Sequence, residues 1–277
     1  MSKKLSYWLC LAVFLLFTAG PFVWAFLVAV TPEYAMFSKS TAMLPPEIVW
    51  DNFREVLSLS TRKGSLFFSG VVNSLKAVAV TLAVGLPAAL LAAYALTRLE
   101  FRGRKFIKNS LLITMAIPVM STIIPIYRIF SAERLLDDIF WLSMVYVSSL
   151  LPILTWLISN YFATIPREME EAALVDGCGP VRAFVRIVLP SSVPAIVSAV
   201  LILFLNTWSQ FQIPLILASG PATKPIAIIT SEFMTKDAVQ YGLTAAAGLC
   251  AVIPPVLLTL TLGRFIVAGL TGGAVKE

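Results

Sequence analysis

Hydrophobic residues of this 277-residue chain gather in six long runs, and polar residues gather between the runs. The runs cover residues 7–30, 71–97, 106–127, 140–162, 193–217 and 242–268. At about 1.5 Å of helix per residue, each run is long enough to cross the roughly 30 Å hydrocarbon core of a bilayer. The pattern predicts an all-α integral membrane protein whose six transmembrane helices form one domain, residues 1–277.

Proline and aromatic residues modify two parts of this pattern. Pro118 and Pro125 lie inside the third run, where each removes a backbone donor, so we expect a kinked or partly unwound helix there. The segment 31–70 is polar, and its Trp50 and Phe53 suit an amphipathic stretch at the outer membrane surface.

Composition narrows the possible functions. Hydrophobic residues make up 58% of the chain and charged residues 13%, and the mean hydropathy is +0.88. Soluble domains carry nearer a quarter charged residues, so these values fit a membrane protein. Histidine is absent and the three cysteines show no CxxC spacing, which argues against a metal site and against the usual acid–base enzymes.

The basic residues indicate an orientation rather than a nucleic-acid partner. The formal net charge is +6, but Lys and Arg gather at the ends of the apolar runs. With six membrane crossings, twelve of the twenty-one Lys and Arg residues lie on the same side of the membrane as the two termini and eight on the opposite side. The remaining residue, Lys76, lies within an apolar run. By the positive-inside rule, both termini and the loop 163–192 are expected in the cytoplasm.

The loop 163–192 has a helical pattern of its own. Strong helix formers fill 167–176, Pro166 precedes them, and Gly177 stands at a C-cap position. A second short helix is expected to begin at Pro180 and end at Pro190. Helical spacing places Arg182 and Arg186 on one face of it and groups four apolar residues on another: Val181, Phe184, Val185 and Val188.

From the residues alone, two interpretations of this loop stay open. It could be an interfacial amphipathic hairpin that only caps the bundle, or an elbow that docks into a groove on a partner. The small side chains of Ala172 and Ala173 would let a partner approach the backbone closely.

The loop also resembles a known motif. It contains Glu171-Ala172-Ala173, then three residues, Gly177, nine residues, Ile187, one residue and Leu189-Pro190. This spacing is similar to the EAA loop of ATP-binding-cassette (ABC) importer permeases. The last segment, 264–276, resembles the C-terminus of the second permease in maltose-type carbohydrate importers. The resemblance covers nearly the whole chain in topology. It implies a type I ABC importer permease fold and a place in the bacterial inner (plasma) membrane.

The resemblance also implies roles for individual residues. It assigns coupling to an ATPase to Glu171, Ala172, Ala173, Leu174, Asp176, Gly177, Ile187, Leu189 and Pro190. Within the C-terminal tail, 269–277, it implies contact with the ATPase for Gly272, Gly273, Val275 and Lys276.

The implied assembly contains a second permease in a heterodimer, two ATPase subunits and an external solute-binding protein. This chain has no G-x-x-x-x-G-K-[ST] motif to cradle nucleotide phosphates. ATP and Mg²⁺ are therefore expected to bind to the partner ATPase, and no cofactor is expected in this chain.

The predicted spans carry no unpaired charge at mid-depth, which favours a neutral polar solute such as a sugar, a polyol or a glycosylated osmolyte. Amides and hydroxyls beside an aromatic ring suit such a solute. The candidate substrate path therefore consists of Asn206, Trp208, Gln210, Gln212 and Tyr127. Polar groups in membranes also join helices, and that alternative applies to these residues and to Asn73, Tyr94 and Thr122.

Two classes of function remain. The first is the permease subunit of an ATP-driven importer that receives a neutral carbohydrate from its external binding protein. The alternative is a stand-alone, ion-coupled secondary transporter. A membrane enzyme is a third class, but the sequence contains no acid–base or metal-ligand cluster that such an enzyme would need.

Overall fold

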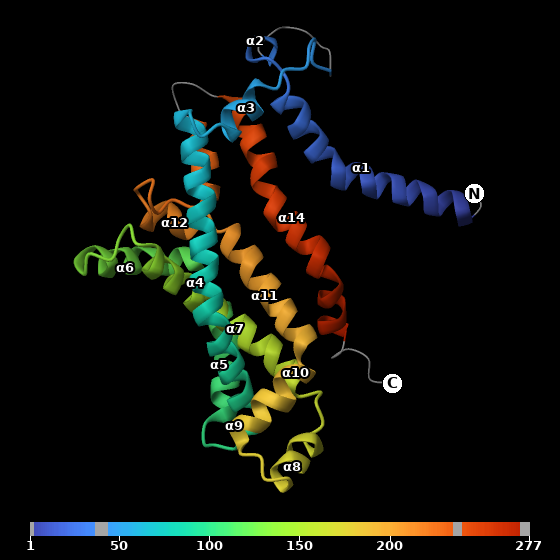
Figure 1. Ribbon diagram of the computed structural model, residues 1–277, viewed down its shortest axis with the longest axis vertical. Helices are drawn as coiled ribbons and strands as arrows, with labels where there is room; N and C mark the ends of the chain where they lie inside the picture. Colours follow the sequence, from blue (N-terminus) through green and yellow to red (C-terminus); the bar gives the residue numbers. More distant parts are fainter. Residues whose placement is uncertain (1–2, 37–43, 235–239, 272–277) are drawn as a thin grey trace. The chain divides into compact units, whose positions relative to one another are not determined.

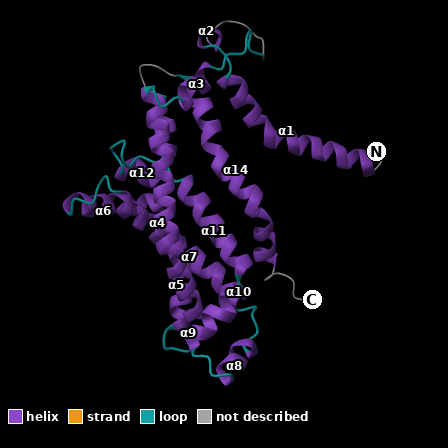
Figure 2. Ribbon diagram, viewed as in Figure 1, coloured by secondary structure: helices purple, strands orange, loops and turns teal. Residues whose placement is uncertain are grey.

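A computed structural model describes residues 3–36, 44–234 and 240–271, and the regular elements of these residues are helices (Figures 1 and 2). They are α1 (Lys3–Ala29), α2 (Glu33–Met36), α3 (Asp51–Leu57), α4 (Arg62–Arg98), α5 (Arg104–Met115), α6 (Val119–Ala132), α7 (Ile139–Phe162), α8 (Glu168–Val175), α9 (Pro180–Ala183), a π-helix (Phe184–Val188), α10 (Leu189–Ser191), α11 (Val193–Trp208), α12 (Gln212–Leu217), α13 (Ile226–Glu232) and α14 (Tyr241–Thr271).

The chain divides into two compact units. The first comprises Met1–Val72 and Pro225–Ile253, and the second comprises Asn73–Lys224 and Pro254–Glu277. Within the described residues, four helices are long and apolar enough to cross a membrane, namely α1, α4, α7 and α14. The number rises to six if each of two bent helix pairs forms one span.

The third predicted span is one of these bent pairs. Helices α5 and α6 meet at an angle of 95°, and Pro118 stands at the junction with extended backbone, φ −65° and ψ 129°. Proline cannot donate a helical hydrogen bond, and it disfavours helical backbone in the residue before it, so the break falls where the sequence predicts a kink. Pro125 instead lies inside α6.

The apolar run 193–217 does not form one continuous helix. Helix α11 ends at Trp208, and α12 begins at Gln212. Pro214 suits this break, because in a continuous helix its missing amide hydrogen would leave the carbonyl of Gln210 without a donor. In the first turn of the separate helix α12, the missing donor costs little. At its other end α11 is preceded by the segment Pro180–Ser191, which is bent from it by 78°.

In the first unit, the end of α1 packs against the short helix α3. The ring of Phe26 lies 6.0 Å from that of Trp50 and 6.3 Å from that of Phe53, between ring centroids. Asn52 Nδ2 donates to the carbonyl of Ala29 at 2.9 Å. The amphipathic stretch expected around Trp50 and Phe53 is thus the helix α3 and its N-cap.

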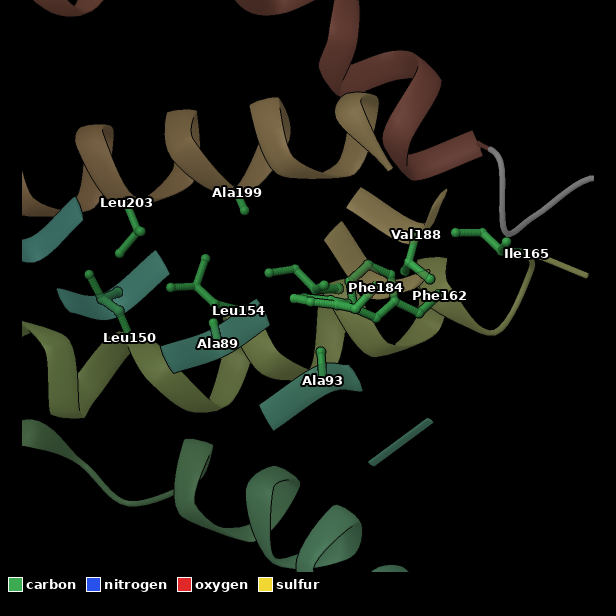
Figure 3. Close-up of a cluster of buried hydrophobic side chains, with 11 residues drawn as sticks. Ala89, Ala93, Leu150, Leu154, Phe162, Ile165, Phe184, Val188, Ala199 and Leu203 are labelled. Atoms are coloured by element: carbon green, nitrogen blue, oxygen red, sulfur yellow. The ribbon is translucent and has the colours of Figure 1, made fainter. Parts of the chain in front are cut away.

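In the second unit, α4, α7 and α11 build one apolar core (Figure 3). Alanines line the α4 and α11 sides, and small residues let helices in a membrane pack closely. The cluster also takes in the π-helix, so the core reaches into the loop after α7. Its buried members are Ala89, Ala93, Leu150, Leu154, Ile158, Phe162, Ile165, Phe184, Val188, Ala199 and Leu203.

The turn between α6 and α7 is held by one carboxylate. Asp137 Oδ1 accepts hydrogen bonds from the amides of Ser219 and Gly220 and from the hydroxyl of Thr223. Burial acts to raise the pKa of Asp137, but these bonds and the nearby Lys224 outweigh it and lower the pKa below its ordinary value. The ionised carboxylate therefore stabilises this turn.

Candidate functional site

The loop between α7 and α11 contains two helical arms, which we call the elbow (residues 168–191). Its first arm is α8, and three acidic residues occupy the first turn: Glu168, Glu170 and Glu171. Carboxylates there interact favourably with the positive end of the helix dipole. The predicted helix over 167–176 is therefore present, shorter by one residue at each end.

Gly177 terminates this arm in a Schellman motif. The amide of Cys178 donates to the carbonyl of Ala173 at 2.9 Å, and the amide of Gly177 donates to that of Leu174 at 3.1 Å. The motif needs left-handed backbone, and Gly177 has a φ of +83°. The predicted helix end at Gly177 is confirmed, with Asp176 as the C-cap residue and Gly177 as the left-handed residue after it.

The second arm differs from its prediction. Instead of one α-helix ending at Pro190, the segment passes from α9 through the π-helix into α10, which ends at Ser191. Phe184 and Val188 are buried, whereas Val181 and Val185 are exposed, so the predicted single apolar face is wrong. The spacing of that face assumed 3.6 residues per turn, and the wider π-helical turn rotates its members apart.

The outer surface of the elbow exposes apolar side chains in a polar loop. Val175 is 87% exposed and Val181 is 76% exposed, and Met169, Leu174 and Val185 are also exposed. A shallow hollow of ≈ 550 Å³ lies on the second arm, lined by Gly177, Gly179, Pro180, Val181, Arg182, Val185 and Arg186. Apolar residues rimmed by charge are typical of a contact surface for another protein.

Most of the predicted coupling residues lie on this outer surface. The exposed ones are Glu171, Ala172, Leu174, Asp176, Gly177 and Pro190. Ala173 is buried, and Ile187 and Leu189 are half-buried. The predicted tail contacts Gly272, Gly273, Val275 and Lys276 lie outside the described residues.

The inner surface of the elbow is attached to the membrane helices by a buried ion pair. Arg98 Nε lies 2.5 Å from Glu170 Oε1, and the two side chains are 8% and 10% exposed. Tyr94 donates its hydroxyl to Glu170 Oε2 at 3.1 Å, and Arg98 Nη2 donates to the carbonyl of Ile165 at 2.9 Å. A ring contact lies beside this network, since the centroids of Tyr94 and Phe184 are 4.6 Å apart.

Sequence reasoning missed the pairing of Arg98 with Glu170. The two residues are separated by 72 positions, and each looks like an ordinary charged residue of a membrane-flanking segment. One signal was available: Glu170 and Ala173 are three residues apart and so share a face of α8, on which the alanine leaves room for a close neighbour.

The residues of the candidate substrate path have different surroundings. Trp208 is only 4% exposed and stacks on Phe204, with centroids 5.5 Å apart. Asn206 is exposed and donates to the carbonyl of Ile202 at 2.9 Å. Gln210 is half-buried, and Gln212 and Tyr127 are exposed. The buried indole therefore packs within this chain, whereas the exposed residues keep polar groups accessible.

Two of the other polar residues join segments of this chain. Asn73 Nδ2 donates to the carbonyls of Pro221 and Lys224 at 2.9 and 3.1 Å, and Tyr94 bonds Glu170. Thr122 donates to the carbonyl of Val119 within its own helix. Among the described residues, no group of three or more His, Cys, Asp or Glu side chains could hold a metal ion.

Comparison with known proteins places these features in context. The family described as "Binding-protein-dependent transport system inner membrane component" matches residues 85–272. The trehalose transport system permease protein SugB of Mycobacterium tuberculosis is 30% identical over 278 residues, which cover 99% of each chain. The diacetylchitobiose uptake system permease protein DasC of Streptomyces coelicolor is 30% identical over 257 residues, covering 92% of this chain and 91% of that protein.

The fold has a solved counterpart. A chain of a bacterial ABC transporter involved in the import of the acidic polysaccharide alginate superposes with a TM-score of 0.76 at 19% identity, covering 94% of this chain and 95% of that chain.

Proposed function

This chain belongs to the family of binding-protein-dependent transport system inner membrane components, and we propose that it carries a neutral carbohydrate across the inner membrane together with a second permease. It is a multi-pass permease of an ABC importer, not a stand-alone secondary transporter. In the proposed assembly, an external binding protein delivers the solute, two ATPase subunits bind ATP and Mg²⁺, and both termini of this chain lie in the cytoplasm.

One observation carries the proposed attachment to the ATPase. Val175 and Val181 are among the most exposed large apolar side chains, and both lie on the elbow. Burying each of them against a partner would remove apolar surface from water, worth about 1.5–3 kcal/mol for a fully buried valine. The elbow therefore offers a partner protein a compact apolar contact, as in helix-in-groove recognition.

The solute class rests on different observations. The relatives named above are permeases for trehalose and diacetylchitobiose, both neutral disaccharides. The exposed polar groups of the candidate path, Asn206, Gln212 and Tyr127, are uncharged and offer hydrogen bonds that suit sugar hydroxyls.

The attachment is tested with Val175→Asp in the purified complex. An aspartate at this exposed position breaks no contact within the chain but places a charge in the proposed interface. We expect normal membrane insertion and loss of ATPase co-purification. The matched control is Ala163→Asp, which adds the same carboxylate to an exposed position of the same loop outside the elbow. Normal ATPase binding by Val175→Asp would refute the docking role.

Transport itself is tested in proteoliposomes that contain the whole complex. Uptake should require ATP and should persist when ion gradients are collapsed. The solute is identified by a thermal-shift screen of the cognate binding protein against neutral disaccharides, polyols and an acidic oligosaccharide. Stabilisation by the acidic sugar alone would contradict the neutral class.

A further inference from the structure

The elbow lies between α7 and α11 in the chain, yet side-chain hydrogen bonds attach it to the C-terminal end of α4. Both carboxylate oxygens of Glu170 are occupied, one by Arg98 and one by Tyr94. Arg98 in turn reaches the carbonyl of Ile165, in the segment that leads into α8. One carboxylate therefore joins α8 to two successive turns of α4.

Two further arginines converge on the same end of α4. Arg104, the first residue of α5, donates through Nε to the carbonyl of Leu96 at 2.8 Å and through Nη2 to that of Thr97 at 3.1 Å. Arg167, directly before α8, donates to the carbonyl of Thr97 at 3.3 Å. The last carbonyls of a helix have no partner within it, so these guanidinium groups cap α4 and attach both α5 and the start of α8 to its end.

Helix α8 thus has two functionally different faces. Glu170 and Ala173 lie three residues apart and are buried, while Glu171 and Val175 lie four residues apart and are exposed. The exposed pair belongs to the proposed docking surface, and the buried pair faces the helices of the core. The buried face therefore gives α8 itself a side-chain connection to α4, beside the contact that Arg167 makes just before the helix.

Stability alone is a weak reason for this network. Burying two charges costs desolvation that their attraction only roughly offsets, so apolar residues would hold the helix as firmly. Directed hydrogen bonds add orientation, because an arginine–carboxylate pair with a tyrosine on the second oxygen favours one angle between the helices. A transmission element needs such a fixed angle, since rigid-body movement of one element is passed on only through a stiff contact.

We propose that Glu170, Arg98 and Tyr94 are positioning residues that hold α8 at a fixed angle to α4, so that movement of the ATPase is converted into movement of the membrane helices. This inference rests on the proposed function of the elbow. In this role the three residues need no contact with solute or nucleotide, because they act through the exposed face of α8.

The test measures solute taken up per ATP hydrolysed by the complete complex in proteoliposomes. The variant is Glu170→Gln, which keeps the size of the side chain and removes its charge. We expect the ATPase to co-purify and to hydrolyse ATP, while the uptake per ATP falls about five- to tenfold, at the lower end of the range usual for coupling between two sites. The matched control is Glu168→Gln, the same change at an exposed position of the same helix, with unchanged coupling.

Tyr94→Phe provides a second, milder variant, because it removes one hydrogen bond and leaves the ion pair in place. It should lower the uptake per ATP by a smaller factor, even if Glu170→Gln does not fold. Unchanged coupling in Tyr94→Phe and in a folded Glu170→Gln would overturn the proposal. Loss of ATPase binding by a folded Glu170→Gln would also overturn it, because Glu170 would then be a docking residue. Failure of the proposed function is recognised separately, by normal ATPase binding in Val175→Asp.

Discussion

Replacing Gly177 by residues with a side chain tests whether the end of α8 is built as described. The amide and carbonyl groups of this turn are paired only while residue 177 has left-handed backbone, and its φ is +83°. An alanine here could keep the left-handed backbone, which costs energy. Alternatively, the backbone could change, which would break the hydrogen bonds donated by the amides of residues 177 and 178.

The surroundings of Gly177 determine the free-energy cost of adding a side chain there. A Cβ added at Gly177 would meet no heavy atom within 4 Å, so there is no steric term from neighbouring residues. The remaining term is the cost of left-handed backbone for an L-residue, about 1–2 kcal/mol. At about 1.4 kcal/mol per factor of ten, this lowers the ratio of closed to open turn roughly five- to thirtyfold. Asparagine tolerates this conformation better, so Gly177→Asn should cost less than Gly177→Ala.

Hydrogen–deuterium exchange measures this change directly. We expect faster exchange in residues 176–178 of the folded protein, in the order wild type, Gly177→Asn, Gly177→Ala. The control is Gly179→Ser, because Gly179 has ordinary extended backbone, φ −70° and ψ 161°, and open space for a Cβ. Serine also suits this N-cap position, so exchange should not increase there. Equal exchange in wild type and Gly177→Ala would refute the backbone explanation.

Two further predictions concern other turns. Gly64→Ala should lower the melting temperature in detergent by several degrees, because the new Cβ would lie 2.0 Å from the carbonyl oxygen of Ser58. The control Gly20→Ala should not lower it, because a Cβ there would meet no heavy atom within 4 Å. Equal melting temperatures of the two variants would contradict the close packing at Gly64. Asp137→Ala should lower the melting temperature at neutral pH. The folded-state pKa of Asp137 is below its ordinary 3.8, so its stabilisation is complete above that value and is lost as the pH falls through the folded pKa. The difference from wild type should disappear only in that acidic range, and a loss already near pH 6 would assign the effect to another group.

The turn at Gly177 also illustrates which features could be predicted locally. A glycine after a run of strong helix formers has one main explanation, and the Schellman motif agrees with it. A kink in the third apolar run was also predictable, since proline removes a backbone donor, although this alone does not distinguish Pro118 at the break from Pro125 inside α6. Such features depend on neighbouring residues, so no tertiary information is needed to find them.

The second arm of the elbow could not be predicted in the same way. Apolar residues at 3.6-residue spacing suggested one face over 181–188, but the π-helix turns Phe184 and Val188 into the core and leaves Val181 and Val185 outside. The π-helical turn places the ring of Phe184 against that of Tyr94, with centroids 4.6 Å apart, and the regular apolar spacing of the segment gave no sign of such a turn.

Local sequence patterns were enough to establish that this protein crosses a membrane, that a polar loop with helical pattern separates two of its apolar runs, and that Gly177 ends a helix there. These properties follow from the length of apolar runs and from backbone sterics, which act over a few residues. The packing of the folded chain was needed to establish that Glu170 faces inward to meet Arg98, 72 positions away, while Val175 faces outward. Which face of a short helix is buried depends on the helices that pack against it, and the periodicity of the short helix does not identify those neighbours.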